Sequence, residues 1–120
     1  MDLNEVLRMF ILDVIADDYE SLEKIQNEVR ELGARAGLMI EPPEIVRGVT
    51  DLIHSGLVRT YRLSPTRPSE ELPGVPLPEE LGDLYYWLTE EGQALQLSEY
   101  QHWPFDETGN LRKDWHPPSG

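Results

Sequence analysis

The chain has 120 residues, of which 39% are hydrophobic, and this size and composition suit one compact domain with an apolar core. It contains no cysteine, which excludes disulfide frameworks, thiolate metal sites and cysteine nucleophiles. Taken alone, the formal net charge of −13 disfavours nucleic acid as a ligand, because phosphates attract basic surfaces. No apolar run approaches the ~20 residues that span a bilayer, and the chain begins with acidic residues, so a cytoplasmic protein is expected.

The first half of the chain is predicted to form three helices. Apolar residues recur at helical spacing over residues 3–16 and again over residues 22–32. Gly33 is expected to end the second helix, because glycine readily adopts the left-handed conformation that closes a helix. The third helix is expected to begin near Pro42, since proline suits the first helical turn, and to end before Gly56.

The second half is predicted to form two strands separated by a long loop. Residues 57–63 have the composition of a strand, and residues 84–88 alternate between apolar and aromatic positions as a returning strand would. The segment 64–83 holds five of the ten prolines and is therefore expected to be a loop. A last helix is expected from Thr89 to about residue 100, followed by a tail.

Positive charge gathers in the middle of the chain. Residues 33–67 hold five basic and three acidic residues, whereas residues 1–32 carry a net charge of −6 and residues 68–120 a net charge of −9. This middle third contains the third helix and the first strand. A protein that reads DNA needs its positive charge on the elements that touch the duplex, so the third helix and the first strand are the natural place to look for such an interface.

Three stretches carry a resemblance to a known family: the opening helix Phe10–Ile15, the helix exit Asp51–Val58 and the strand return Tyr85–Gly92. The last two are similar to a "leucine, glycine, leucine, isoleucine or valine" exit and a "leucine-threonine-x-x-glycine" return. These motifs resemble the winged helix-turn-helix superfamily, in particular small bacterial regulators of the PadR and MarR type. The resemblance implies an α+β winged-helix domain over residues 1–100, with 64–83 as a long proline-rich wing and 101–120 as a tail partly packed on it.

The resemblance also implies a DNA-binding transcriptional regulator, which would be a homodimer if its sites are palindromic. The third helix would enter the major groove of double-stranded DNA and the wing would hold the backbone. The residues expected to contact DNA are Arg47, Thr50, His54, Arg59, Arg62 and Arg67. Arg47 has a second interpretation, since Glu44 and Asp51 lie at the spacing of ion pairs along one helix.

A second hypothesis is an acidic winged-helix protein-protein interaction module that does not bind DNA, favoured by the net charge and the acidic wing. Tryptophan and tyrosine are enriched at interface hot spots, so the candidate contacts are Tyr85, Trp87, Trp103, Phe105 and Trp115. Alternatively, the tail folds back and buries Trp103 and Phe105 against the outer face of the sheet. The segment Pro73–Pro78 suits either a polyproline ligand or a rigid spacer.

No pattern of catalytic residues stands out in the chain. The histidines His54, His102 and His116 match no recognised zinc spacing, and no Ser/His/Asp order or phosphate-binding glycine loop is evident. The sequence therefore predicts no enzyme, no metal site and no cofactor.

Overall fold

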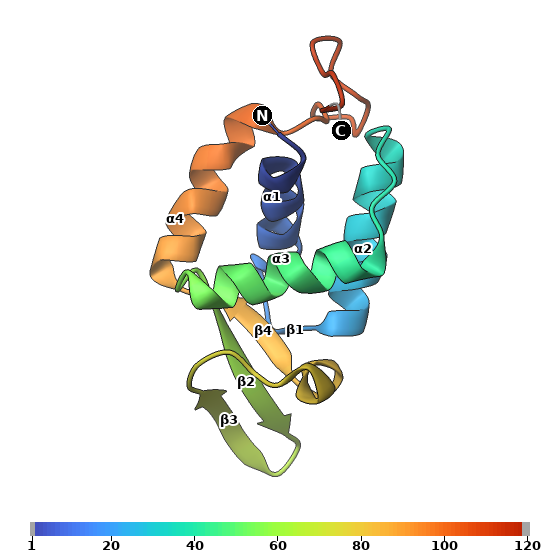
Figure 1. Ribbon diagram of the computed structural model, residues 1–120. Coiled ribbons are helices and arrows are strands. Elements are labelled where there is room, and N and C mark those ends of the chain that lie inside the picture. The colour runs from blue at the N-terminus through green and yellow to red at the C-terminus, as the bar shows by residue number, and fades with distance from the viewer. Residues whose placement is uncertain (1, 119–120) are drawn as a thin grey trace.

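The computed structural model describes residues 2–118 and has a mixed α+β architecture (Figure 1). Helix α1 lies at the centre of the helical part, with α2 and α4 on either side and α3 crossing it, and the sheet lies at one end. None of the described helices is long and apolar enough to cross a membrane. The elements follow in the order α1 (Leu3–Ile15), β1 (Glu20–Ser21), α2 (Leu22–Arg35), α3 (Pro42–His54), β2 (Val58–Ser64), β3 (Arg67–Leu72), the 3-10 segment η1 (Pro78–Asp83), β4 (Tyr85–Leu88), α4 (Glu90–Glu99) and the 3-10 turn η2 (Tyr100–His102).

The helix starts follow local capping chemistry. Asp2 and Glu5 form a capping box at the start of α1, in which each side chain accepts a hydrogen bond from the other residue's backbone N–H. The side chain of Ser21 caps α2 in the same manner. The start of α3 at Pro42 confirms the sequence prediction.

The predicted end of α2 at Gly33 is wrong. The helix continues to Arg35, and the turn that closes it contains Gly37, whose φ is 82°. Gly33 is needed for packing, because a Cβ at this position would lie 2.8 Å from Cδ1 of Ile40. Gly33 thus permits a close approach between α2 and the segment that follows it. The left-handed conformation that closes the helix is adopted by Gly37 instead.

The sheet is antiparallel with the strand order β1-β4-β2-β3. Strands β2 and β4 confirm the two predicted strands. Strand β3 lies inside the 64–83 segment, so the prediction of a loop throughout that segment is wrong. In this hairpin Thr60 of β2 lies opposite Leu72 of β3. All β3 residues before Leu72 are exposed, so the strand lacks the alternation of buried and exposed residues that sequence analysis looks for. Pro68 is tolerated because β3 is an edge strand.

The sheet and the helices share one core. Leu84, Tyr86 and Leu88 face the helices and are buried, as the alternation of the returning strand predicts. The Tyr86 hydroxyl donates a 2.7 Å hydrogen bond to the carbonyl oxygen of Leu81, and burial raises the pKa of this phenol well above its usual value. This bond ties η1 to the core and holds the end of the long connection against the domain.

The tail packs on the helices rather than on the sheet. The ring of Trp103 meets Phe10 of α1 edge to face, with centroids 5.6 Å apart, and Phe105 is 8% exposed beneath the guanidinium of Arg35. The indole N–H of Trp115 donates to the carbonyl oxygen of Ala36 at 3.0 Å. The prediction that Trp103 and Phe105 are buried against the outer face of the sheet is therefore wrong. The tail therefore covers apolar surface on α1 at Phe10 and at the C-terminal end of α2.

A titration at Asp13 is expected to change stability with pH. Burial raises the pKa of this carboxyl above 3.8, although the 2.9 Å hydrogen bond donated by the Tyr100 hydroxyl opposes the shift and nearby Asp17 adds to it. The folded state therefore holds the proton to higher pH than the unfolded state, and stability from this group falls as pH rises above 3.8. Asp13→Asn does not titrate. In urea unfolding, its stability relative to the parent should increase from pH 3.5 to pH 6, and a constant difference would contradict this assignment.

Candidate functional site

Helix α3 presents few positive groups to solvent. Arg47 is exposed, and none of the ion pairs among residues 2–118 includes it, so the expected pairing with Glu44 or Asp51 is not formed. Thr50 is half-buried, and its hydroxyl donates to the carbonyl oxygen of Val46 at 2.9 Å, within its own helix. His54 is exposed at the end of the helix.

The arginines of the β2–β3 hairpin lie beside carboxylates. Nε of Arg59 is 3.4 Å from a carboxylate oxygen of Glu71, and both side chains are about half exposed. Arg62 lies directly opposite Glu70 in the register of the two strands, and Arg67 lies opposite Ser64 near the turn. Strand β3 thus brings two acids next to the arginines of β2, an arrangement that a loop prediction did not reveal.

The candidate DNA-contacting surface is therefore electrically balanced. Its four arginines, Arg47, Arg59, Arg62 and Arg67, share α3 and the hairpin with four carboxylates, Glu44, Asp51, Glu70 and Glu71. A neutral surface gains little from phosphate contacts, which supply most of the affinity of non-specific DNA binding.

The outer face of the sheet carries an aromatic cluster formed by Tyr19, Tyr61 and Trp87. The ring centroid of Tyr19 lies 4.9 Å from that of Tyr61 and 4.6 Å from that of Trp87. Tyr85 is half-buried on the same face, opposite Tyr61 in the strand register. The indole Nε1 of Trp87 is buried and has no hydrogen-bond partner in the described part of the chain.

Only part of the expected aromatic interface is therefore brought together. Tyr85 and Trp87 lie on the sheet, whereas Trp103, Phe105 and Trp115 belong to the tail and pack on the helices. Tyr19 and Tyr61 were missing from the predicted set. Tyr61 was detectable from the alternation of β2, which places it beside Arg59 on the outer face. Tyr19 carries no such signal, because it lies in the connection between α1 and β1.

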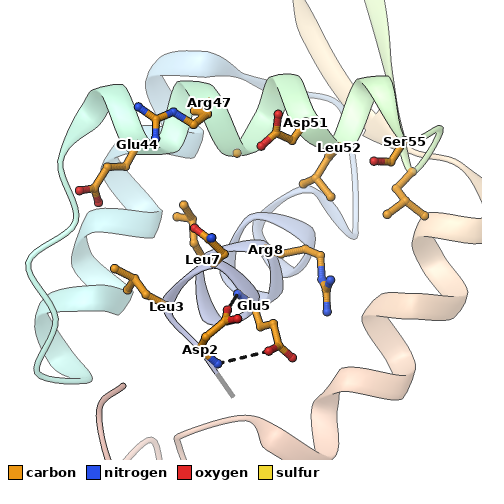
Figure 2. A pocket seen from close by; sticks show the side chains of 13 residues that line it. Asp2, Leu3, Glu5, Leu7, Arg8, Glu44, Arg47, Asp51, Leu52 and Ser55 are labelled. Atoms are coloured by element: carbon orange, nitrogen blue, oxygen red, sulfur yellow. Dashed lines mark hydrogen bonds between the residues drawn. The ribbon is translucent and has the colours of Figure 1, made fainter. Parts of the chain in front are cut away.

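A groove of about 560 Å³ lies between the start of α1 and helix α3 (Figure 2). Leu3 and Leu7 of α1 and Leu52 of α3 extend toward the space between the two helices. The charged residues of the lining are Asp2, Glu5, Arg8, Glu44, Arg47 and Asp51. No pattern in the sequence groups the α1 residues with those of α3.

Arg8 is the one charged groove residue among these with an ion-pair partner in the described chain. Its guanidinium lies 2.6 Å from a carboxylate oxygen of Glu99 in α4, and Glu99 is only 5% exposed. The other carboxylate oxygen of Glu99 is buried and has no hydrogen-bond partner among residues 2–118. Arg8 thus joins α1 to α4, and its positive charge is balanced by a buried acid.

The proline-rich connection does not form one continuous polyproline helix. Gly74 has a φ of 71°, which interrupts the negative φ that this helix requires. Val75 and Leu77 beyond it are exposed.

Within residues 2–118, no three or more histidine, aspartate or glutamate side chains come close enough to hold a metal ion. No protein-family model matches the chain, and searches of curated proteins and of solved structures find no significant match.

Proposed function

We propose that this chain is a protein-interaction module built on a winged-helix-like domain. Three helices precede the β2–β4 strand pair, and the strand return closes onto the exit of α3, which supports the family resemblance. The observation that carries the functional proposal is that two hairpin arginines lie beside carboxylates of β3: Arg59 forms an ion pair with Glu71, and Arg62 lies opposite Glu70 in the strand register. An acidic protein without a free basic strip is better suited to proteins than to DNA.

The concave setting of α3 also supports a protein partner. A recognition helix enters the major groove of DNA by projecting from the surface of its domain. Glu44, Arg47 and Asp51 instead line a hollow shared with the start of α1. The aromatic cluster of Tyr19, Tyr61 and Trp87 supplies the residue types that dominate protein interfaces.

A DNA-binding regulator is the second candidate function. The specific observation in its favour is that Arg47, Arg59, Arg62 and Arg67 are all exposed and lie on the two elements that a winged-helix protein presents to DNA. The two candidates differ in whether these arginines remain available to phosphate.

Removing the β3 carboxylates tests this difference. We expect the parent chain not to bind a 30-base-pair duplex in fluorescence anisotropy at about 50 mM salt, where phosphate contacts are strongest. Glu70→Gln combined with Glu71→Gln should create weak, salt-sensitive binding, because Arg59 and Arg62 lose their acidic neighbours. The matched control is Glu79→Gln with Glu80→Gln in η1, which changes the net charge equally and should have no effect. Tight duplex binding by the parent chain would overturn the proposal.

A further inference from the structure

We propose that the groove between α1 and α3 binds an amphipathic helix of a partner protein, with a basic, an acidic and a basic residue at positions i, i+3 or i+4, and i+7. This inference rests on the proposed interaction function and names a surface and a partner chemistry that the aromatic sheet face does not provide. Docking of a helix in a groove between two helices is a recurring mode of peptide recognition.

Most residues that line the groove are polar or charged, and leucines give it a smaller apolar part that suits the apolar face of such a helix. Its volume of about 560 Å³ lies between two helices, and Gly48 of α3 packs against Leu7 and Ile11 of α1. Leu3 and Leu57 are half-buried and line the groove. Figure 2 shows Leu3 at one end of the groove and Leu52 near the other. A partner helix that inserts leucine-like side chains would bury this apolar surface.

The unpaired charges on α3 set the register. Glu44, Arg47 and Asp51 lie at positions i, i+3 and i+7 of one helix, and no ion pair of the described residues includes them. With a rise of 1.5 Å per residue, Glu44 and Asp51 are about 10 Å apart along the axis. A second helix has the same rise, so two basic residues seven positions apart can face both carboxylates while an acidic residue between them faces Arg47.

The wider charge distribution agrees with a cationic segment as the occupant. Asp2 and Glu5 place two more carboxylates on the α1 wall, and the positive charge of Arg8 is neutralised by Glu99. The net charge of −13 attracts a basic segment from a distance. An acidic helix would meet repulsion both at the groove and from the whole molecule.

A displayed library of helical peptides tests the inference. Leucines are fixed on one face, and lysine or glutamate is randomised at three positions corresponding to i, i+3 or i+4, and i+7. We expect selection by the full chain to enrich the Lys-Glu-Lys pattern over Glu-Lys-Glu. Anisotropy measured with both synthetic peptides should give about tenfold tighter binding for the first at 50 mM salt, because each exposed pair contributes modestly.

A charge-exchanged variant provides the matched control. Glu44→Lys, Arg47→Glu and Asp51→Lys together reverse the pattern on α3 at exposed or half-exposed positions, and circular dichroism checks that the helix remains folded. This variant should prefer the Glu-Lys-Glu peptide. Enrichment without a charge pattern, or an unchanged preference in the variant, would overturn the groove assignment.

The same assay separates failure of the groove from failure of the proposed function. If no charge pattern is enriched and the chain also fails to bind duplex DNA, the groove assignment is wrong while an interaction module remains supported by the aromatic face. If duplex DNA displaces a bound peptide or is itself bound tightly, the groove assignment and the proposed function are both wrong.

Discussion

Replacing Gly92 by alanine is expected to lower the free energy of unfolding by about 3 kcal/mol, at the upper end of overpacking effects. A Cβ at this position would lie 2.1 Å from the carbonyl oxygen of Leu57. That oxygen accepts a hydrogen bond from the backbone N–H of Thr89, so it cannot move away without disturbing the start of α4. The clash is with backbone and cannot be relieved by a change of rotamer.

Thermal and urea unfolding of Gly92→Ala measure this effect, and the melting temperature should fall by about 10 °C. The matched control is Gly82→Ala, because a Cβ at Gly82 meets no heavy atom within 4 Å. The control should change stability by less than about 0.5 kcal/mol. Equal stability of the two variants would show that the start of α4 can shift away from Leu57 at little cost.

Replacing Arg8 by methionine is expected to destabilise the fold by about 2 kcal/mol. The change leaves the Glu99 carboxylate without its only ion-pair partner in residues 2–118, and the side chain of Glu99 is 6% exposed. Breaking a buried pair costs about 3–5 kcal/mol. We expect a smaller loss of stability here because the Arg8 side chain is 36% exposed, so solvent screens the ion pair.

A double variant distinguishes loss of the partner from loss of packing. Arg8→Met with Glu99→Leu removes the buried charge together with its partner, and most of the stability should return. Urea unfolding of the two single variants and the double variant gives the coupling free energy. A double variant as unstable as the sum of the single variants would mean that the two side chains act independently.

Helices α1, α2 and α3 and the strands β2 and β4 could be predicted because their apolar residues follow a simple period, and α4 because Thr89 caps its start. The strand return could be recognised as a motif, and its physical basis is now clear. The Thr89 hydroxyl donates to the carbonyl oxygen of Gly56 and accepts from the backbone N–H of Gly92, while Gly92 packs on Leu57. Threonine and glycine at these positions therefore join the exit of α3 to the start of α4.

The remaining elements depend on tertiary contacts that no local pattern records. Strand β3 is exposed along most of its length, so it lacks the alternation that identifies a half-buried strand. Strand β1 has two residues, too few for any period. The end of α2 was misplaced because Gly33 serves packing against Ile40, a contact that becomes visible only once the chain has folded.

The candidate site was predictable one residue at a time but not as an arrangement. The exposure of Arg59 follows from the strand period, whereas Arg62 falls in phase with the buried residues Val58 and Thr60. The acidic neighbours of both arginines, Glu70 and Glu71, come from a segment expected to be a loop. The groove combines α3 with the start of α1, which lies some forty residues earlier in the chain. Long-range pairing of this kind changes the electrostatic character of the surface without changing its composition.

Selection from a random duplex DNA library at about 50 mM salt tests the central claim most directly, with Arg47→Ala run beside the parent chain. The proposed interaction module predicts that folded parent protein enriches no sequence family. Enrichment of one family by the parent chain, lost in Arg47→Ala, would contradict it and would identify α3 as a reader of the major groove.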